Sequence, residues 1–397
     1  MKSQNKSTIL NVIRLQGPIS RAEIAKLTRL TPPTVTNIVS ELLESRLVME
    51  SEHGESTGGR KPIMLRINSA AYHVIGVYAG SLKVKAVAAQ LDGKIVHQTE
   101  LAIPSSPTKE QFLQVLLQAV RLGLEGSGRT REEILGIGVG MHGLVDPTRG
   151  VSIFAPNLNL YDIDIKGVLE SEFGLSVEVD NDVRALALGE SWFGQGQGIA
   201  NFVCVNVGTG VGTGILIDHK PYHGATFTAG ELGHTTIDVN GPRCSCGNYG
   251  CLEALTGGPA IARRALQGIR IGKRSLLEEW TDGDLEEITS EMVHRAALQG
   301  DSLAVEVLND TGRYLGIGIS NLINTLNPSR IILSGGVSRA GDFILNSLQD
   351  VVEMRALKPS ASTVSIVVSE LGPNANVIGA FTLLLDKLFT PSGIEGV

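Results

Sequence analysis

The sequence lacks any apolar run of about eighteen residues, the length that a helix needs to cross a membrane. It also lacks the apolar region of a signal peptide, because residues 1–6 lead directly into a helical pattern. Cysteine is scarce, with 4 in 397 residues, and the spacing gives no framework of disulfide pairs. These absences argue against a membrane-spanning or secreted class. They predict a cytoplasmic protein without a membrane partner.

Charge is unevenly distributed along the chain. Residues 1–66 hold 10 Lys or Arg and 6 Asp or Glu, a net charge of +4 on a protein whose total is −7. A basic leading segment on an acidic body is typical of a nucleic-acid-binding module attached to another domain. The length and the 42% of hydrophobic residues allow two or three domains with large cores. We predict one domain at residues 1–68 and a second at 69–397.

The first domain has the pattern of a winged helix-turn-helix. Apolar spacing predicts helices over residues 7–16 and 21–27, with Ser20 and Glu23 forming a capping box. A further helix begins at Thr31-Pro32, with Thr as its cap and Pro in its first turn. Apolar residues 47–49 and 63–65 predict two strands of a hairpin. Two capped helices joined by a tight turn and followed by a hairpin indicate DNA binding, with protein contacts as the alternative.

The expected DNA contacts lie on the third helix and in the hairpin loop. The helix carries small polar side chains that can approach base edges in the major groove. In the loop, flexible glycines precede an arginine suited to a narrow minor groove. The predicted DNA-binding residues are Pro33, Thr34, Thr36, Asn37, Ser40, Arg60 and Lys61.

Three of the cysteines gather in one stretch, residues 230–253, which we call the zinc loop. Cys244, Cys246 and Cys251 follow His234 at short distance. One imidazole and three thiols complete the four protein ligands of a structural zinc site and leave no open position for water. The sequence therefore predicts structural Zn²⁺ held by these four residues.

Two carboxylates bracket the predicted metal ligands. Glu231 precedes His234 by three residues, and Glu253 follows Cys251 by two. Three thiolates already over-neutralise the ion, so the carboxylates are free for another ligand. A metal-bound histidine offers its second ring nitrogen as a donor. Together these groups predict a hydroxyl-binding wall of a sugar site.

From Tyr72 onward a meander of strands, a helix, a strand and a helix occurs twice along the chain. Such duplication predicts two α/β lobes with a cleft near residues 181–253. Asp180-Asn181-Asp182 ends a strand and opens a helix, and Asn157 lies on a loop. Gly208–Gly212 is a turn that could hold a phosphate, and Ser334-Gly335-Gly336 is a place for a nucleotide.

Together these features resemble the ROK family, named for repressors, open reading frames and sugar kinases. Its most specific motif is Glu231-Leu-Gly-His234 followed by Cys244-Ser-Cys-Gly-Asn-Tyr-Gly-Cys251-Leu-Glu253. The resemblance implies an α/β protein: a winged helix-turn-helix and a duplicated actin-like (ribonuclease H-like) two-lobed sugar-kinase fold with an inserted zinc loop. Matched position by position, it implies sugar contacts at Asn157, Asn181, Asp182, Glu231, His234 and Glu253. Asp182 matches the general base of the family's kinases.

One departure separates a regulator from an enzyme. Family kinases begin this body with Asp-x-Gly-Gly-Thr-Lys, whose acid and glycines handle Mg²⁺ and the ATP phosphates. Here the run is Tyr78-Ala-Gly-Ser-Leu-Lys83. Phosphoryl transfer depends on neutralising phosphate charge, and an aromatic ring cannot coordinate Mg²⁺. Asp182 is therefore expected to be a vestigial base. A lesser departure is His142, where relatives usually have proline; this change could tune the sugar preference.

These observations predict a sugar-responsive repressor of carbohydrate-utilisation genes that binds its sugar without phosphorylating it. The expected partners are operator DNA and a sugar of the xylose, glucose or N-acetylglucosamine class, with the protein a homodimer or a dimer of dimers. One alternative is an active ROK sugar kinase with an appended DNA-binding domain. Another is a regulator triggered by a partner protein.

Overall fold

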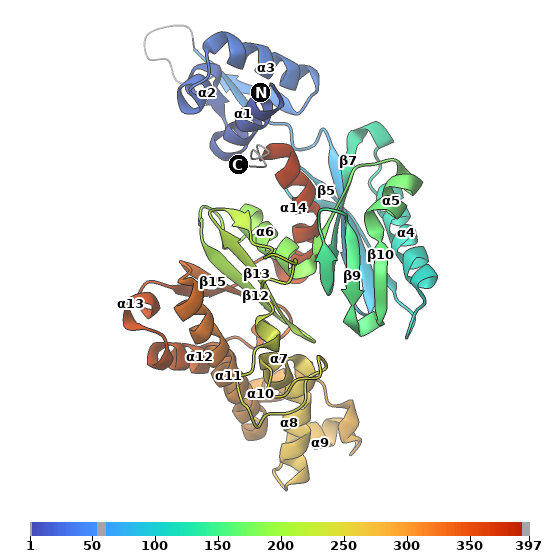
Figure 1. Ribbon diagram of the computed structural model, residues 1–397, viewed down its shortest axis with the longest axis vertical. Coiled ribbons are helices and arrows are strands. Elements are labelled where there is room, and N and C mark those ends of the chain that lie inside the picture. Colours follow the sequence, from blue (N-terminus) through green and yellow to red (C-terminus); the bar gives the residue numbers. More distant parts are fainter. Residues whose placement is uncertain (1, 54–60, 391–397) are drawn as a thin grey trace. The chain divides into compact units, whose positions relative to one another are not determined.

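The computed structural model describes residues 2–53 and 61–390 (Figure 1). It divides into two compact units. Unit 1 comprises Met1–Ala185 and Asn374–Val397, and unit 2 comprises Leu186–Pro373. Within the described residues, no helix is long and apolar enough to cross a membrane.

The chain begins as a winged helix-turn-helix. The helices are α1 (Lys2–Gln16), α2 (Arg21–Thr28) and α3 (Pro32–Glu44); the strands are β1 (Ile19–Ser20), β2 (Val48–His53) and β3 (Ile63–Ile67). The predicted capping box of α2 is present, because the Ser20 hydroxyl accepts from the Glu23 amide and the Glu23 carboxylate accepts from the Ser20 amide. Thr31 caps α3 as expected. The short β1 was not expected; it completes a sheet of order β1-β3-β2.

Unit 1 contains a five-stranded sheet of order β11-β7-β4-β5-β6. Its elements are β4 (His73–Ala79), β5 (Lys83–Gln90), β6 (Ile95–Ala102), α4 (Lys109–Gly126), β7 (Ile134–Met141), α5 (Ile165–Phe173), β11 (Val177–Asn181), α6 (Asp182–Phe193), which continues into unit 2, and α14 (Ala375–Phe389). A separate sheet, not expected from the sequence, has the order β10-β9-β8 and is formed by β8 (Leu144–Asp146), β9 (Val151–Ala155) and β10 (Leu160–Asp164). The predicted domain boundary at residues 68/69 falls between β3 and β4 and stays a prediction.

Helices cover both faces of the five-stranded sheet in unit 1 (Figure 1). Successive side chains of a strand point to opposite faces. The Ile75 side chain points to α4, because it lies near Gly123. A Cβ on Gly76 would instead point to α14, where it would meet Val377 and Phe381. A Cβ on Gly138, on the neighbouring strand, would lie only 1.9 Å from the Ala380 carbonyl oxygen. These glycines therefore let α14 pack directly on the sheet backbone.

Unit 2 has a sheet of order β14-β13-β12-β15-β16. The strands are β12 (Phe202–Val207), β13 (Val211–Ile217), β14 (Lys220–Pro221), β15 (Arg330–Ser334) and β16 (Ser365–Val368). The helices are α7 (Leu252–Thr256), α8 (Gly258–Arg270), α9 (Leu276–Trp280), α10 (Ser290–Leu298), α11 (Ser302–Leu326), α12 (Asp342–Arg355) and α13 (Lys358–Ala361). Val203, Val205 and Leu333 join the buried face of α11 in one core.

The two five-stranded sheets share one connectivity. In unit 1, β4 pairs antiparallel with β5 and parallel with β7, which pairs parallel with β11. In unit 2, β12 pairs antiparallel with β13 and parallel with β15, which pairs parallel with β16. The predicted duplication of an α/β lobe is therefore confirmed.

Candidate functional site

Unit 2 brings His234, Cys244, Cys246 and Cys251 together. One ligand atom from each lies within 4.8 Å of every other. The Cys246 and Cys251 sulfurs are 3.7 Å apart, and the Cys244 sulfur is 3.7 Å from His234 Nδ1. A zinc–sulfur bond of about 2.3 Å places two sulfurs of a tetrahedral site ~3.8 Å apart. The cluster can therefore hold a metal ion.

The protonation chemistry of these thiols fits a cation. Burial raises the pKa of Cys251 to about 12, so a thiolate at this position needs a positive charge beside it. A hydrogen bond from the Asn248 backbone lowers the pKa of Cys246, which favours the thiolate. Cysteine coordinates metals as the thiolate, and the metal itself drives deprotonation.

The zinc loop is shaped by turns and bridges, with only short regular elements before α7. Thr236 and Cys251 form an isolated antiparallel bridge, as do Arg243 and Tyr249. Gly250 has a φ of +65°, and a Cβ at this position would lie 1.5 Å from the Asp238 carbonyl oxygen. Only glycine fits here. The backbone thus returns Cys251 to the other ligands.

The two carboxylates of the zinc loop have different surroundings. Glu231 is exposed, and its Oε2 lies 3.9 Å from His234 Nε2, the ring nitrogen on the side away from Cys244. Glu253 is half-buried: its Oε2 accepts from the Val211 amide at 3.0 Å and its Oε1 from the Ser245 hydroxyl at 3.2 Å. Sequence reasoning missed these bonds, which tie Glu253 to the turn between β12 and β13. The Val211 amide, which belongs to the turn predicted to hold a phosphate, is therefore paired with the Glu253 carboxylate.

In unit 1, the carboxyl ends of β4, β7 and β11 adjoin, because Met141 pairs with both Ala79 and Asn181. Residues 180–184 form what we call the Asp182 corner. Asp180 and Arg184 make a buried ion pair, with Nε donating to Oδ1 at 2.8 Å. Arg184 also donates to the Val145 carbonyl at 3.1 Å. Arg184 is not among the predicted site residues, although its spacing of four from Asp180 is that of a helical ion pair.

The polar atoms of Asn181 are engaged within the protein. Its Oδ1 accepts from the Val183 and Arg184 amides and caps α6, while its Nδ2 donates to the Gly143 carbonyl at 2.9 Å. Nδ2 also donates to Asp182 Oδ1 at 3.1 Å. Asn181 therefore orients the neighbouring carboxylate, which is a positioning role.

Asp182 is buried, and desolvation raises its pKa. Its Oδ1 accepts from Asn181 and from the Val183 amide. Among the described residues, no hydrogen bond reaches its Oδ2. A buried carboxylate with one oxygen held and one unpaired is suited to accept a hydrogen bond from a hydroxyl group.

The Tyr78 hydroxyl interacts electrostatically with Asp182. Burial and the Asp182 charge raise the pKa of this hydroxyl, which also forms a hydrogen bond with Asn376. The ring lies over the following turn, because a Cβ on Gly80 would be 2.8 Å from the Tyr78 hydroxyl oxygen. The Tyr78 side chain therefore occupies the space beside the turn between β4 and β5.

The remaining predicted sugar contact, Asn157, is exposed on a 3-10 turn, Pro156–Leu158, between β9 and β10. Asn157, Asn181 and Asp182 belong to unit 1, and Glu231, His234 and Glu253 to unit 2. Each group is described within its own unit, and a shared sugar site stays a prediction.

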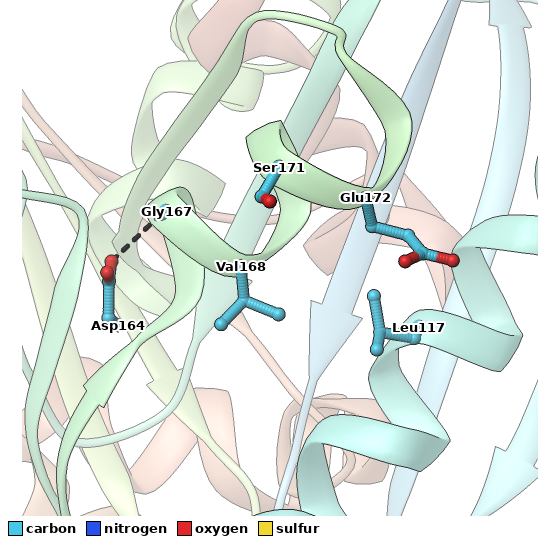
Figure 2. Close-up of a pocket in the computed structure, with 6 residues that line it drawn as sticks. All are labelled: Leu117, Asp164, Gly167, Val168, Ser171 and Glu172. Carbon is cyan, nitrogen blue, oxygen red and sulfur yellow. Dashed lines mark hydrogen bonds between the residues drawn. The ribbon is translucent and has the colours of Figure 1, made fainter.

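A hollow of about 470 Å³ in unit 1 contains none of the predicted site residues. It is lined by Leu117 of α4, by Gly167, Val168, Ser171 and Glu172 of α5, and by Asp164 (Figure 2). Asp164 Oδ1 accepts from the Gly167 amide at 2.8 Å, the dashed line in Figure 2, and so caps α5. This carboxylate therefore has a structural role.

The predicted DNA-reading face of α3 is exposed. Pro33, Thr36, Asn37 and Ser40 point outward, whereas Val35, Ile38, Val39 and Leu42 are buried. Thr34 is half-buried with its hydroxyl 2.8 Å from that of Thr31. Lys61 is exposed, and Arg60 lies outside the described residues. Their contacts with DNA stay a prediction.

Comparison with known proteins decides the family. The model described as "ROK family" matches residues 74–387, and that described as "Winged helix-turn-helix DNA-binding" matches residues 3–49. The chain belongs to the ROK family. The predicted α/β fold, a winged helix-turn-helix joined to an actin-like ROK body, is thereby confirmed.

ROK relatives include both regulators and kinases. The chain is 31% identical to a xylose repressor of Caldicellulosiruptor bescii, over 98% of this chain and 97% of the relative. It is 32% identical to the DNA-binding transcriptional dual regulator NagC of Escherichia coli, over 97% of this chain and 93% of the relative. A ROK family transcriptional regulator, a homologue of the E. coli MLC protein, matches with a TM-score of 0.87 and 30% identity (98% and 97%). A Streptomyces griseus ROK glucokinase solved with glucose and AMPPNP matches with a TM-score of 0.71 and 32% identity, over 78% of this chain and 98% of its own. The regulators match nearly the whole chain, whereas the glucokinase has no counterpart to about a fifth of it.

Proposed function

We propose that this protein is a transcriptional repressor of carbohydrate-utilisation genes that releases its operator when a small sugar binds to its ROK body. The observation that carries this proposal is a winged helix-turn-helix, with an exposed polar face on α3, joined to a sugar-kinase-like body. Relatives that share both parts over nearly their whole lengths are named repressors or regulators.

Operator binding is assigned to the exposed face of α3 and to Arg60 and Lys61, which precede β3 in the sequence. Asn37 and Ser40 are small enough to let α3 approach base edges, and the lysine and arginine suit backbone or minor-groove contacts. A homodimer, or a dimer of dimers, would present two α3 helices to the half-sites of a palindromic operator.

Sugar binding is assigned to Asn157 and Asp182 of unit 1, with Asn181 orienting Asp182, and to Glu231, His234 and Glu253 of unit 2. Asp182 Oδ2, which accepts no hydrogen bond from the described residues, would accept one from a sugar hydroxyl. His234 Nε2 and the Glu231 carboxylate, which face each other, would bind further hydroxyls. The effector is a free sugar of the xylose, glucose or N-acetylglucosamine class.

We assign structural Zn²⁺ to His234, Cys244, Cys246 and Cys251. Zinc would supply charge neutralisation and a fixed loop geometry, since four protein ligands leave no open coordination position. His234 would bind the ion through Nδ1, the nitrogen near Cys244, and keep Nε2 for the sugar.

We propose that the protein does not phosphorylate the sugar. The acid of the kinase phosphate motif is replaced by Tyr78, whose hydroxyl lies against the Gly80 turn. Phosphoryl transfer needs metal and cationic stabilisation of the phosphate charge. Tyr78 supplies neither, because burial and Asp182 raise its hydroxyl pKa and keep it neutral.

Fluorescence anisotropy of a labelled operator fragment, with D-xylose, D-glucose and N-acetyl-D-glucosamine added in turn, tests the function. We expect tight operator binding that one of these sugars reverses. Operator binding that no sugar alters would contradict a sugar sensor and favour a partner protein as the trigger.

The second candidate function, a sugar kinase with a DNA-binding domain, is favoured by the retained Asp182 and by the glucokinase neighbour. An ATP-consumption assay with the same three sugars separates the two functions. We expect no turnover. Sugar-dependent turnover that Asp182→Asn abolishes would establish the kinase.

A further inference from the structure

His142 directly follows β7 and its side chain is buried, with 8% exposure. Its Nδ1 lies 3.1 Å from the Ala79 carbonyl oxygen at the end of β4. A carbonyl oxygen can only accept, so Nδ1 carries the hydrogen. In the neutral ring, Nε2 is then a lone-pair acceptor. The Ala79 contact therefore fixes both the tautomer and the orientation of the ring.

The other ring nitrogen of His142, Nε2, has no hydrogen-bond partner among the described residues. It is also shielded from solvent. Leaving a buried acceptor unpaired costs free energy, and nearly all buried polar atoms in folded proteins have a partner. Such an atom at a candidate binding site indicates that a bound molecule supplies the missing donor.

The position of His142 places this acceptor at the Asp182 corner. Met141 pairs with Asn181 across β7 and β11, so the residues that follow them, His142 and Asp182, extend from adjacent strand ends. The two side chains interact electrostatically, since the Asp182 charge favours protonated His142. Burial has the larger effect and lowers the His142 pKa, which keeps the ring neutral.

We propose that His142 Nε2 is a specificity-determining acceptor that binds a donor group on the sugar beside the hydroxyl bound by Asp182. This inference rests on the function proposed above. The donor is a ring hydroxyl or an acetamido N–H, and a sugar without a donor at that carbon is disfavoured. Because Nε2 is shielded, the covering groups must move before a sugar reaches it.

A second buried histidine supplies the control. His73 is 3% exposed, and neither of its ring nitrogens has a hydrogen-bond partner in the described chain. His73 is the first residue of β4 and Ala79 is the last, so the two residues lie roughly 20 Å apart along the strand. His73 therefore shares the burial of His142 but not its position at the Asp182 corner.

Two variants separate the acceptor from the rest of the ring. His142→Asn keeps an N–H group for the Ala79 carbonyl and lacks an acceptor at the Nε2 position. His142→Gln can place an amide oxygen near that position. His73→Asn is the matched control. Thermal melting and metal content of each full-length variant establish that it is folded.

The measurement is calorimetric affinity for D-xylose, D-glucose and N-acetyl-D-glucosamine, each with its monodeoxy analogues. We expect one analogue to bind the wild-type protein about three- to tenfold more weakly than its parent sugar. His142→Asn should bind the parent sugar correspondingly more weakly and should no longer distinguish it from that analogue. His142→Gln should restore part of the discrimination, and His73→Asn should retain all of it.

If His142→Asn still distinguished each parent sugar from its analogues by the same factors as the wild type, the inference would be overturned. The proposed function would remain intact. Unchanged affinity in His142→Asn would likewise overturn the inference alone. If the wild-type protein bound none of the sugars, the proposed function would fail and this inference with it.

Discussion

The zinc loop and the Asp182 corner both carry predicted sugar contacts, but different interactions hold them in place. The zinc loop has only short regular elements before α7, and its four ligand atoms converge on one point. The Asp182 corner joins a sheet edge to a helix and is fixed by a buried ion pair and an asparagine cap. The first geometry would depend on the proposed Zn²⁺, whereas the second depends on the folded core. Changes that disrupt one should therefore leave the other in place.

The largest effect is expected from His234→Ala, which removes one of four ligands. Structural zinc sites of this type contribute on the order of 10 kcal/mol to the folding of the segments that they hold. We expect loss of both bound zinc and the sugar response, measured by elemental analysis and operator anisotropy.

Cys204→Ala is the control for the zinc loop, because Cys204 is buried on β12 and lies outside the cluster. It should retain zinc and the sugar response. A His234→Ala protein with normal zinc and a normal response would refute the coupling between the metal and the sugar.

Arg184→Met tests the Asp182 corner. It leaves Asp180 buried without its cationic partner, and breaking a buried pair from one side costs about 3–5 kcal/mol. Urea unfolding should show that loss, with zinc content unchanged. Arg270→Met is the matched control, because the Arg270–Glu286 pair is exposed and should contribute at most about 1 kcal/mol. Equal losses of stability in the two variants would show that the buried Asp180–Arg184 pair does not hold the corner in place.

Glu253→Gln is expected to weaken sugar binding while sparing the metal. The amide keeps an oxygen for the Val211 amide but loses the negative charge. Hydrogen bonds to charged groups contribute about 1.5–3 kcal/mol, so affinity should fall roughly 10- to 100-fold by calorimetry. A loss of zinc in this variant would show that Glu253 supports the loop rather than the sugar.

The smallest effect concerns Asn37→Ala on the exposed face of α3. A side chain that contacts a base edge contributes about 1–3 kcal/mol to discrimination. Operator affinity should fall accordingly in anisotropy titrations, with no change in melting temperature. Asn240→Ala, exposed on the zinc loop, should change neither quantity. Full operator affinity in Asn37→Ala would remove this residue from the DNA interface.

Much of the fold follows from local sequence signals. The Ser20–Glu23 capping box and the Thr31-Pro32 start of α3 depend on neighbouring residues, and both are present. The two lobes follow from a repeated order of strands and helices. The β8–β10 sheet was missed because its strands are only 3–5 residues long and leave little periodicity.

Less of the candidate site than of the fold could be predicted from the sequence. Three cysteines and a histidine within eighteen residues indicate a metal site because the chain itself keeps them close. In contrast, the bond from Val211 to Glu253 and the contact of His142 with Ala79 join residues 42 and 63 positions apart. Such contacts depend on strand pairing and turn geometry, which a single sequence does not specify.

The central claim is that one sugar-binding event and one DNA-binding event are coupled. It is tested most directly by measuring the sugar affinity of the full-length protein with and without saturating operator DNA. Thermodynamic linkage requires that operator weaken sugar binding by the same factor by which sugar weakens operator binding, typically about 5- to 150-fold. We expect this reciprocal loss of affinity. Equal sugar affinity in the two conditions would contradict it.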